Sequence, residues 1–149
     1  MTQEQKDLLL KDLCARLPYG VVIQEKCVEQ DKTFLPNKEG DRLVNIDAHA
    51  DLLMTNCGSW YYLDEIKPYL FPLSSMTNEL WDKEFMGCGI TEFTRDSFKY
   101  GCETLDFSRS NPNLSSMVRF INQLIKNHFD IYGLIEKGLA IDATGLNIY

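Results

Sequence analysis

Several features are missing from the sequence, and each absence excludes a class of protein. No Lys or Arg stands next to another, and the net charge is −7 with a pI near 4.8. A nucleic-acid-binding surface needs clustered basic residues, so we expect no nucleic-acid partner. No run approaches the roughly 20 apolar residues of a membrane span, and the charged opening segment MTQEQKDLLLKDL lacks the apolar core of a signal peptide. These absences predict no membrane association and a cytoplasmic location.

Paired cysteines are missing too. An odd number of thiols with no Cys-x-x-Cys spacing is typical of a reducing compartment, where free cysteines are usually small buried side chains. A cysteine nucleophile would need a thiol beside His49 or His128, and nothing in the sequence places one there. His128 and Asp130 could pair, but residues two apart on a helix point away from each other. We expect all five thiols to be buried: Cys14, Cys27, Cys57, Cys88 and Cys102.

The length of 149 residues predicts a single domain, 1–149, with a hydrophobic core of its own. The apolar pattern changes twice along the chain. Residues 1–17 have helical periodicity and residues 19–73 contain short strand-like runs. Residues 77–149 are mainly helical, and a hairpin is expected at 90–107.

The first helix is expected from Thr2 to Leu17. Thr2 and Gln5 have the spacing of a capping box, and Pro18 follows the last apolar residue. From Val21 onward, short strand-like runs alternate with polar turns. No crossover helix fits between these runs, so we expect antiparallel pairing in a meander or a small SH3-like barrel.

The stretch Trp60–Thr77 joins the β region to the helical region. It begins with three aromatic residues, which favour a strand, and stays apolar past Pro68 and Pro72. Because proline has no backbone N–H to donate, this segment is expected to be an edge strand or an extended crossing rather than a central strand. Ser75 or Thr77 is then placed to cap a helix.

Two further helices are expected near the C-terminus. Leu114–Asn127 carries apolar residues on one face with Asn113 as its cap, and Ile131–Lys137 forms a short closing helix that Gly138 ends. The tail is apolar enough to dock as an extended strand. The predicted fold is α+β, with an N-terminal helix, a small antiparallel SH3-like barrel or meander, and C-terminal helices packed on it.

Asp47, His49 and Asp51 form the sharpest chemical pattern in the sequence. In an extended segment these alternate residues share one face, and two carboxylates with an imidazole suit Mn²⁺ or Zn²⁺. The segment VNIDAHADLL also resembles the metal signature of arginase-like ureohydrolases, which implies a metal-dependent hydrolase. The later SxDxD-type segment of those enzymes is missing here, and a polar turn between strands is the simpler interpretation.

Aromatic residues concentrate between Trp60 and Trp81. Most of them must fill a core, but a β region with surplus aromatics often keeps one or two for a partner surface. The candidate binding residues are Trp60, Tyr62, Tyr69 and Trp81.

Three long segments resemble a family of small uncharacterised proteins from gut anaerobic bacteria and their phages. They are KDLCARLPYGV at Lys11–Val21, EIKPYLFPLSSMT at Glu65–Thr77 and HFDIYGLIEKGLAIDA at His128–Ala143. They occur in family order, and residues 80–113 between them match no pattern of the family. The resemblance implies a cytosolic protein of bacterial or phage origin and implies no particular activity.

The predicted function is a non-enzymatic binding protein that engages a host protein or sequesters a small ligand, with no cofactor. A homo-oligomer is compatible with this prediction. The alternative, from a different class, is a metal-dependent hydrolase in which Asp47, His49 and Asp51 hold Mn or Zn.

Overall fold

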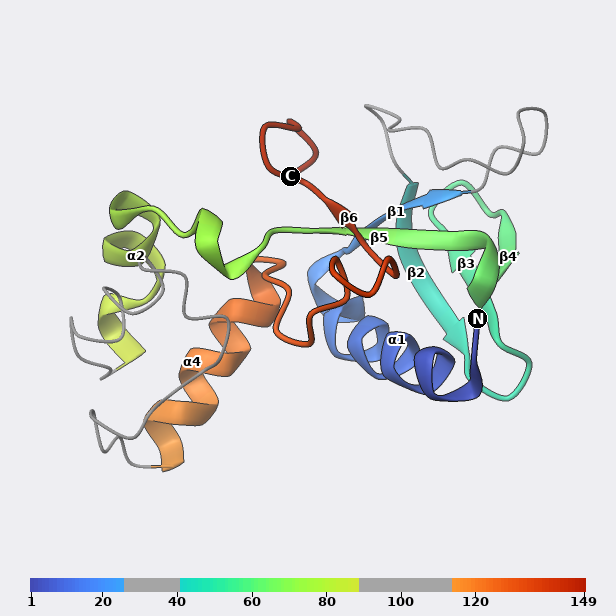
Figure 1. The fold of residues 1–149 in the computed structure, drawn as a ribbon, viewed down its shortest axis with the longest axis horizontal. Helices are drawn as coiled ribbons and strands as arrows, with labels where there is room; N and C mark the ends of the chain where they lie inside the picture. The colour runs from blue at the N-terminus through green and yellow to red at the C-terminus, as the bar shows by residue number, and fades with distance from the viewer. Residues whose placement is uncertain (26–40, 89–113) are drawn as a thin grey trace. The chain divides into compact units, whose positions relative to one another are not determined.

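The computed structural model describes residues 1–25, 41–88 and 114–149. The chain divides into two compact units (Figure 1), and each has its own hydrophobic cluster. Unit 1 comprises Met1–Leu70 and Tyr132–Tyr149, and unit 2 comprises Phe71–Ile131. The single domain expected from the chain length stays a prediction.

Unit 1 begins with the helix α1, Gln3–Arg16, as predicted. The Thr2 hydroxyl accepts from the Gln5 backbone N–H and the Gln5 side chain accepts from the Thr2 N–H, so the predicted capping box is confirmed. A 3₁₀ turn, Leu17–Tyr19, follows, and Gly20 ends it at φ 68°. The left-handed region suits glycine, which explains the sharp stop before the first strand.

Unit 1 continues with an open six-stranded mixed sheet in the order β4-β3-β2-β1-β5-β6. All neighbouring strands are antiparallel except β5 and β6, which are parallel. The strands are β1 Val22–Glu25, β2 Asp41–Asp47, β3 Leu52–Thr55, β4 Trp60–Tyr62, β5 Ile66–Leu70 and β6 Ile141–Asp142. The α+β class and the short antiparallel strands are confirmed. The SH3-like barrel is not confirmed, because β4 and β6 are the two edges and the sheet is not closed.

The strand β5 is interior, so the prediction of an edge strand or a crossing segment is wrong. The backbone directions explain how a proline is accommodated there. Ala143 N–H donates to the Leu70 carbonyl, so the backbone groups of Leu70 and, two residues earlier, of Pro68 face away from β1. Pairing with β6 starts only at Tyr69. Pro68 therefore lies where no neighbouring strand requires its missing N–H.

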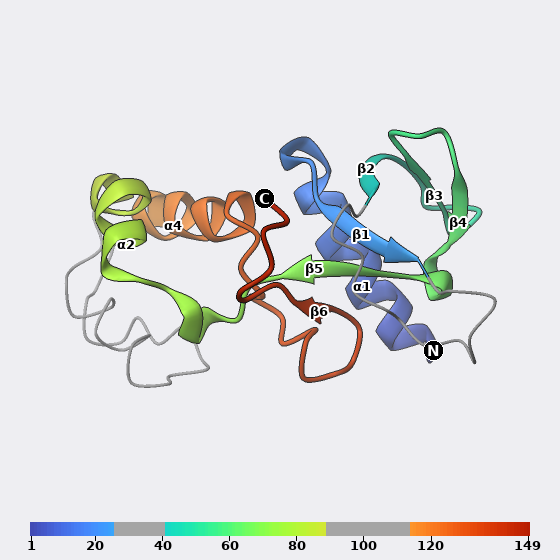
Figure 2. The same ribbon diagram turned by 90° about the horizontal axis from the view of Figure 1, so that it is seen from above.

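The helix α1 supplies the core of unit 1 together with one face of the sheet (Figure 2). Leu9 and Leu13 of α1 are fully buried beside Ile23, Leu53 and Ile66 of the strands. The predicted closing helix Ile131–Lys137 does not form, and turns take its place.

Gly133 explains why that helix is absent. It adopts φ 65°, a conformation that a helix interior cannot contain, whereas Gly138, at φ 68°, lies just past the predicted helix. The tail then docks as the strand β6, as predicted, and it runs parallel to β5.

Unit 2 is built on an aromatic cluster. It contains the 3₁₀ turn Leu73–Ser75, the helix α2 (Asn78–Glu84), the turn Met86–Cys88 and the helix α4 (Leu114–Lys126). Thr77 caps α2 through its hydroxyl, as predicted. The cluster contains four aromatic rings, and the centroid of each ring lies 6.3 Å or less from that of another: Trp81, Phe85, Phe120 and Phe129. The helix α4 packs on α2 through its buried residues Phe120 and Leu124, whereas Leu114 and Val118 of the predicted face are exposed.

The end of α4 is stabilised by a C-terminal turn that His128 completes. His128 adopts φ 59°, its N–H donates to the Ile125 carbonyl, and the Phe129 N–H donates to the Leu124 carbonyl. This is the Schellman pattern, with histidine at the position that usually holds glycine. The buried His128 therefore has a structural role at the helix end.

The hairpin predicted at 90–107 and the cap predicted at Asn113 lie outside the described residues. Within residues 1–25, 41–88 and 114–149, no helix has both the length and the apolar character that crossing a membrane requires.

Candidate binding face

The strands β2, β3 and β4 form two rows of side chains on one side of the sheet. Tyr62 pairs with Leu52 and Leu52 pairs with Asp47, while Trp60 pairs with Met54 and Met54 pairs with Asn45. Directly paired residues share a face of the sheet. We call the surface formed by these six residues the outer face: Asn45, Asp47, Leu52, Met54, Trp60 and Tyr62.

The opposite side of the same strands faces the core, which accounts for the direction of the aromatics. Tyr61 pairs with Leu53 and Leu53 pairs with Ile46, and all three belong to the core of unit 1 or pack against it. Because successive side chains of a strand alternate, burial of Tyr61 directs Trp60 and Tyr62 outward.

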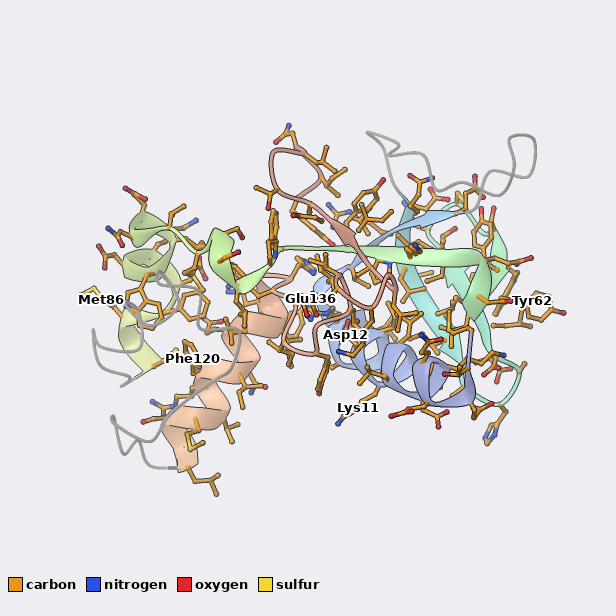
Figure 3. All side chains as sticks on the ribbon, viewed as in Figure 1. Lys11, Asp12, Tyr62, Met86, Phe120 and Glu136 are labelled. Carbon is orange, nitrogen blue, oxygen red and sulfur yellow. The ribbon has the colours of Figure 1, made fainter. Side chains whose placement is uncertain are left out.

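The two aromatics of the outer face are unusually exposed for their size. Trp60 is 50% exposed and Tyr62 is 56% exposed. Figure 3 shows the Tyr62 side chain projecting away from the strand. Leu52 and Met54 beside them are only half-buried. The outer face therefore presents apolar and aromatic groups to solvent at a place where the inner face already supplies the core.

The free edge of β4 is partly covered by the chain itself. The Leu63 N–H donates to the Asp51 carbonyl and the Thr55 N–H donates to the Ser59 carbonyl, so the backbone groups of Trp60 and Tyr62 face outward from the sheet edge. The Glu65 carboxylate accepts the outward N–H of Tyr62 at 2.9 Å. A charged side chain on an edge strand discourages strand addition.

Carboxylates outnumber cations around the outer face, and β2 also carries the exposed Arg42. From Leu43 to Glu65 the chain contains four carboxylates, those of Asp47, Asp51, Asp64 and Glu65, and no Lys or Arg. Lys6 of α1 pairs with Asp51 at 2.9 Å, and this hydrogen bond raises the pKa of Lys6. Of the other three, Asp64 lies on the α1 side beside Gln5, so Asp47 and Glu65 are the carboxylates left at the outer face and its edge.

The structure places Asp47, His49 and Asp51 in a tight turn between β2 and β3. The Asp47 carboxylate accepts the backbone N–H groups of His49 at 3.0 Å and Ala50 at 3.2 Å, which is an Asx-type turn. Asp51 adopts φ 54° and is paired with Lys6, and the His49 side chain is exposed.

In the parts of the chain that the structure describes, no three His, Cys, Asp or Glu side chains come together as a group that could hold a metal ion. Metal binding by Asp47, His49 and Asp51 stays a prediction, and the turn accounts for both aspartates without it.

Two of the four predicted binding aromatics are core residues. Tyr69 has no exposed surface, and its hydroxyl donates to the Gln24 side chain at 2.7 Å. Trp81 is 2% exposed and stacks on Phe85 in unit 2. Neither side chain can contact a partner in the folded protein, so the binding prediction is restricted to Trp60 and Tyr62.

The prediction that all thiols are buried is wrong for two of the three described cysteines. Cys14 and Cys57 are exposed and Cys88 is buried. Burial raises the pKa of the Cys88 thiol. The Cys57 thiol donates to the Asp41 carboxylate at 3.0 Å.

Sequence reasoning missed Leu52, Met54 and Asn45 as neighbours of the aromatics. The signal that could have found them was the turn Asn56–Ser59, which pairs the strand before it with the strand after it. Counting back from that turn places Met54 opposite Trp60.

The sequence pattern also missed the fully buried ion pair between Asp12 and Arg16, whose spacing of four residues is that of neighbours on a helix.

Comparisons with models of known protein families, with curated proteins and with solved structures find no match to this chain. The resemblance to small proteins of gut anaerobic bacteria and their phages therefore stays a prediction. The function has to be argued from the outer face itself.

Proposed function

We propose that this chain is a non-enzymatic binding protein that engages another protein through the outer face. The observation that carries this proposal is the placement of Trp60 and Tyr62 on one side of the sheet, each at least half exposed. Folding does not require them there, because the core of unit 1 is formed on the other side of the same strands.

Large aromatic side chains on a rigid strand are well suited to protein recognition. Tyrosine and tryptophan bury a large area and lose little conformational freedom on binding, and they are enriched among the residues that dominate interface energies. Pairing across β3 fixes the spacing of Trp60 and Tyr62, and Leu52 and Met54 extend the apolar area beside them. A partner that covers these side chains would remove apolar surface from water, which favours association.

The exposure of two large aromatics on the outer face favours a macromolecular partner over a small ligand. Small-molecule sites are usually concave and hold about 300–1,000 Å³. Two cavities lined by described residues have volumes of about 200 and 370 Å³, and neither includes Trp60 or Tyr62. The acidic surroundings of the outer face also disfavour a nucleic-acid partner, because carboxylates repel phosphates.

The test compares which proteins are retained by the wild type and by the Trp60→Ala/Tyr62→Ala double variant. Both are immobilised and exposed to a lysate of the bacterium that carries the gene or the phage, and retained proteins are identified by mass spectrometry. Tyr19→Ala is the matched control, because Tyr19 is 40% exposed and lies in unit 1 outside the sheet.

We expect at least one protein that the wild type and Tyr19→Ala retain equally and the double variant loses. Equal retention by all three proteins would show that the outer face does not bind. Circular dichroism of each variant establishes that it is folded. Sedimentation velocity of the wild type and the double variant shows whether the partner is a second copy of this chain.

A further inference from the structure

We infer that the outer face recognises a cationic segment of its protein partner, with Lys or Arg side chains placed over Trp60 and Tyr62. This inference rests on the proposed binding function and adds the chemistry of the partner.

Local charge is the first support. Asp47 lies in the same row as Tyr62, two strands away, and the Glu65 carboxylate accepts the Tyr62 N–H. Two cations lie at this part of the sheet: Lys6 of α1 is held by Asp51, and Arg42 of β2 donates to the Gly20 carbonyl. A cationic partner is attracted by these carboxylates, and the net charge of −7 adds a long-range attraction in the same direction.

The aromatic rings are the second support. A Lys or Arg placed over the face of an exposed Trp or Tyr is attracted by the electron-rich face of the ring. The aliphatic stem of the same side chain can cover the half-buried Leu52 and Met54 while its charged end stays near Asp47. One type of side chain therefore satisfies both the apolar and the acidic parts of the outer face.

The partner is expected to dock on the face and not to add a strand to the edge. Glu65 already accepts the Tyr62 N–H, which an added strand would need. Strand addition depends on main-chain hydrogen bonds along a free edge, and β4 offers a short edge with this donor occupied. The specificity then comes from side chains on the outer face.

The local potential at Trp60 can be measured directly by fluorescence quenching. Caesium and iodide are applied separately at constant ionic strength. The Trp60→Phe variant retains only the buried Trp81, so its fluorescence is subtracted to obtain the quenching of Trp60. We expect caesium to quench Trp60 more strongly than iodide, after each is normalised to free N-acetyltryptophanamide. Equal or stronger quenching by iodide would overturn the inference.

Binding is tested with three capped peptides of equal length. In the first, Lys and Arg alternate with Val; in the second, Gln replaces every cation; in the third, Glu does. We expect the wild type to bind only the basic peptide in calorimetry at 20 mM salt, and at least threefold more weakly at 200 mM salt.

The variants assign the binding to the outer face. We expect Trp60→Ala/Tyr62→Ala to weaken binding of the basic peptide at least tenfold and Asp47→Asn to weaken it severalfold, with Tyr19→Ala unchanged. Unchanged affinity in the double variant, or equal affinity for the neutral peptide, would overturn the inference. If the lysate partner is lost in the double variant while the wild type binds no basic peptide, the cationic inference fails and the proposed binding function stands.

Discussion

The hydroxyl of Tyr149 donates to the backbone carbonyl of Tyr69 at 2.7 Å. The same hydroxyl accepts the backbone N–H of Val22 at 3.2 Å. Because Ile23 of β1 pairs with Pro68 of β5, Val22 and Tyr69 would form the next pair of that ladder. The Tyr149 side chain therefore bridges β1 and β5 at the point where their direct pairing ends, and the tail contributes to the sheet beyond its own short strand.

Replacing Tyr149 by Phe is expected to lower the stability of unit 1. The substitution keeps the ring but leaves the Val22 N–H and the Tyr69 carbonyl without this bridge, and a buried polar group that loses its partner costs about 1–3 kcal/mol. Urea unfolding followed by circular dichroism measures the difference. Tyr62→Phe removes an exposed hydroxyl and should change the free energy of unfolding by less than about 0.5 kcal/mol. Equal effects of the two substitutions would contradict the bridge.

The protein is expected to lose stability between pH 10 and pH 12. Burial raises the pKa of Tyr149 from 10.0 to about 12, and a hydrogen bond to Glu25 raises the pKa of Tyr61 from 10.0 to about 12. In this range the unfolded chain releases these protons and the folded protein keeps them, so the free energy of unfolding falls as pH rises. Below pH 10 the contribution is fully present.

Urea midpoints at pH 8, 10 and 11 measure this loss, and Tyr149→Phe should lose less than the wild type over the same interval. Absorbance of tyrosinate provides an independent measurement. Tyr149→Phe should reduce the part of the absorbance change that occurs well above pH 10, where tyrosines with a raised pKa lose their protons. An identical pH dependence in the wild type and the variant would contradict the raised pKa.

The buried ion pair of α1 is expected to be costly to break. The Arg16 guanidinium donates to both Asp12 carboxylate oxygens, at 2.7 and 2.8 Å, and both residues are fully buried. Arg16→Met should destabilise the protein by about 3–5 kcal/mol, because it leaves the Asp12 charge buried without its counter-ion. The double variant Asp12→Leu/Arg16→Met should cost less than Arg16→Met alone in urea unfolding.

The exposed ion pair of the same helix provides the comparison. Lys6→Met breaks the pair with Asp51, which is about one-third exposed, and should lower the free energy of unfolding much less than Arg16→Met does. If Arg16→Met and the double variant were equally destabilised, the buried charge would not be the cause of the loss.

Asp47→Ala is expected to change stability and not metal content. The substitution removes the acceptor for two backbone N–H groups in the β2–β3 turn and should cost about 1 kcal/mol, whereas Asp47→Asn keeps an acceptor oxygen and should cost less. Elemental mass spectrometry of protein purified without chelator gives the metal content of each. Near-stoichiometric Mn or Zn in the wild type that is lost in Asp47→Ala would show that Asp47 does more than stabilise the turn. That result would favour the metal-dependent hydrolase.

Local patterns predicted the elements that local interactions determine. The capping box of Thr2 and Gln5 places the start of α1, and the Thr77 hydroxyl places the start of α2, because both signals are contained within four residues. The strands β2 and β3 lie among the short strand-like runs expected within residues 19–73, because polar turns separate them, whereas the break between β4 and β5 at Leu63–Glu65 was not predicted.

Features that depend on distant segments could not be predicted in this way. The interior position of β5 comes from β6, which pairs with it from more than 70 positions away in parallel orientation. Tyr69 of β5 is fully buried and donates to Gln24 of β1, which removes it from the candidate binding residues. Trp60 and Tyr62 remain exposed because the core lies on the Tyr61 side of β4. Alternation in the sequence separates the two sides of β4 but does not say which side is covered.

The central claim is that the outer face contacts a protein, and site-specific photo-crosslinking tests it most directly. The photoreactive amino acid p-benzoylphenylalanine replaces Tyr62 in one variant and Tyr19 in another; both are exposed tyrosines of unit 1. After irradiation in cells of the organism that carries the gene, we expect a discrete covalent adduct from position 62 that Trp60→Ala reduces, and no such adduct from position 19. The absence of an adduct at position 62, or the same adduct from both positions, would contradict a binding role for the outer face.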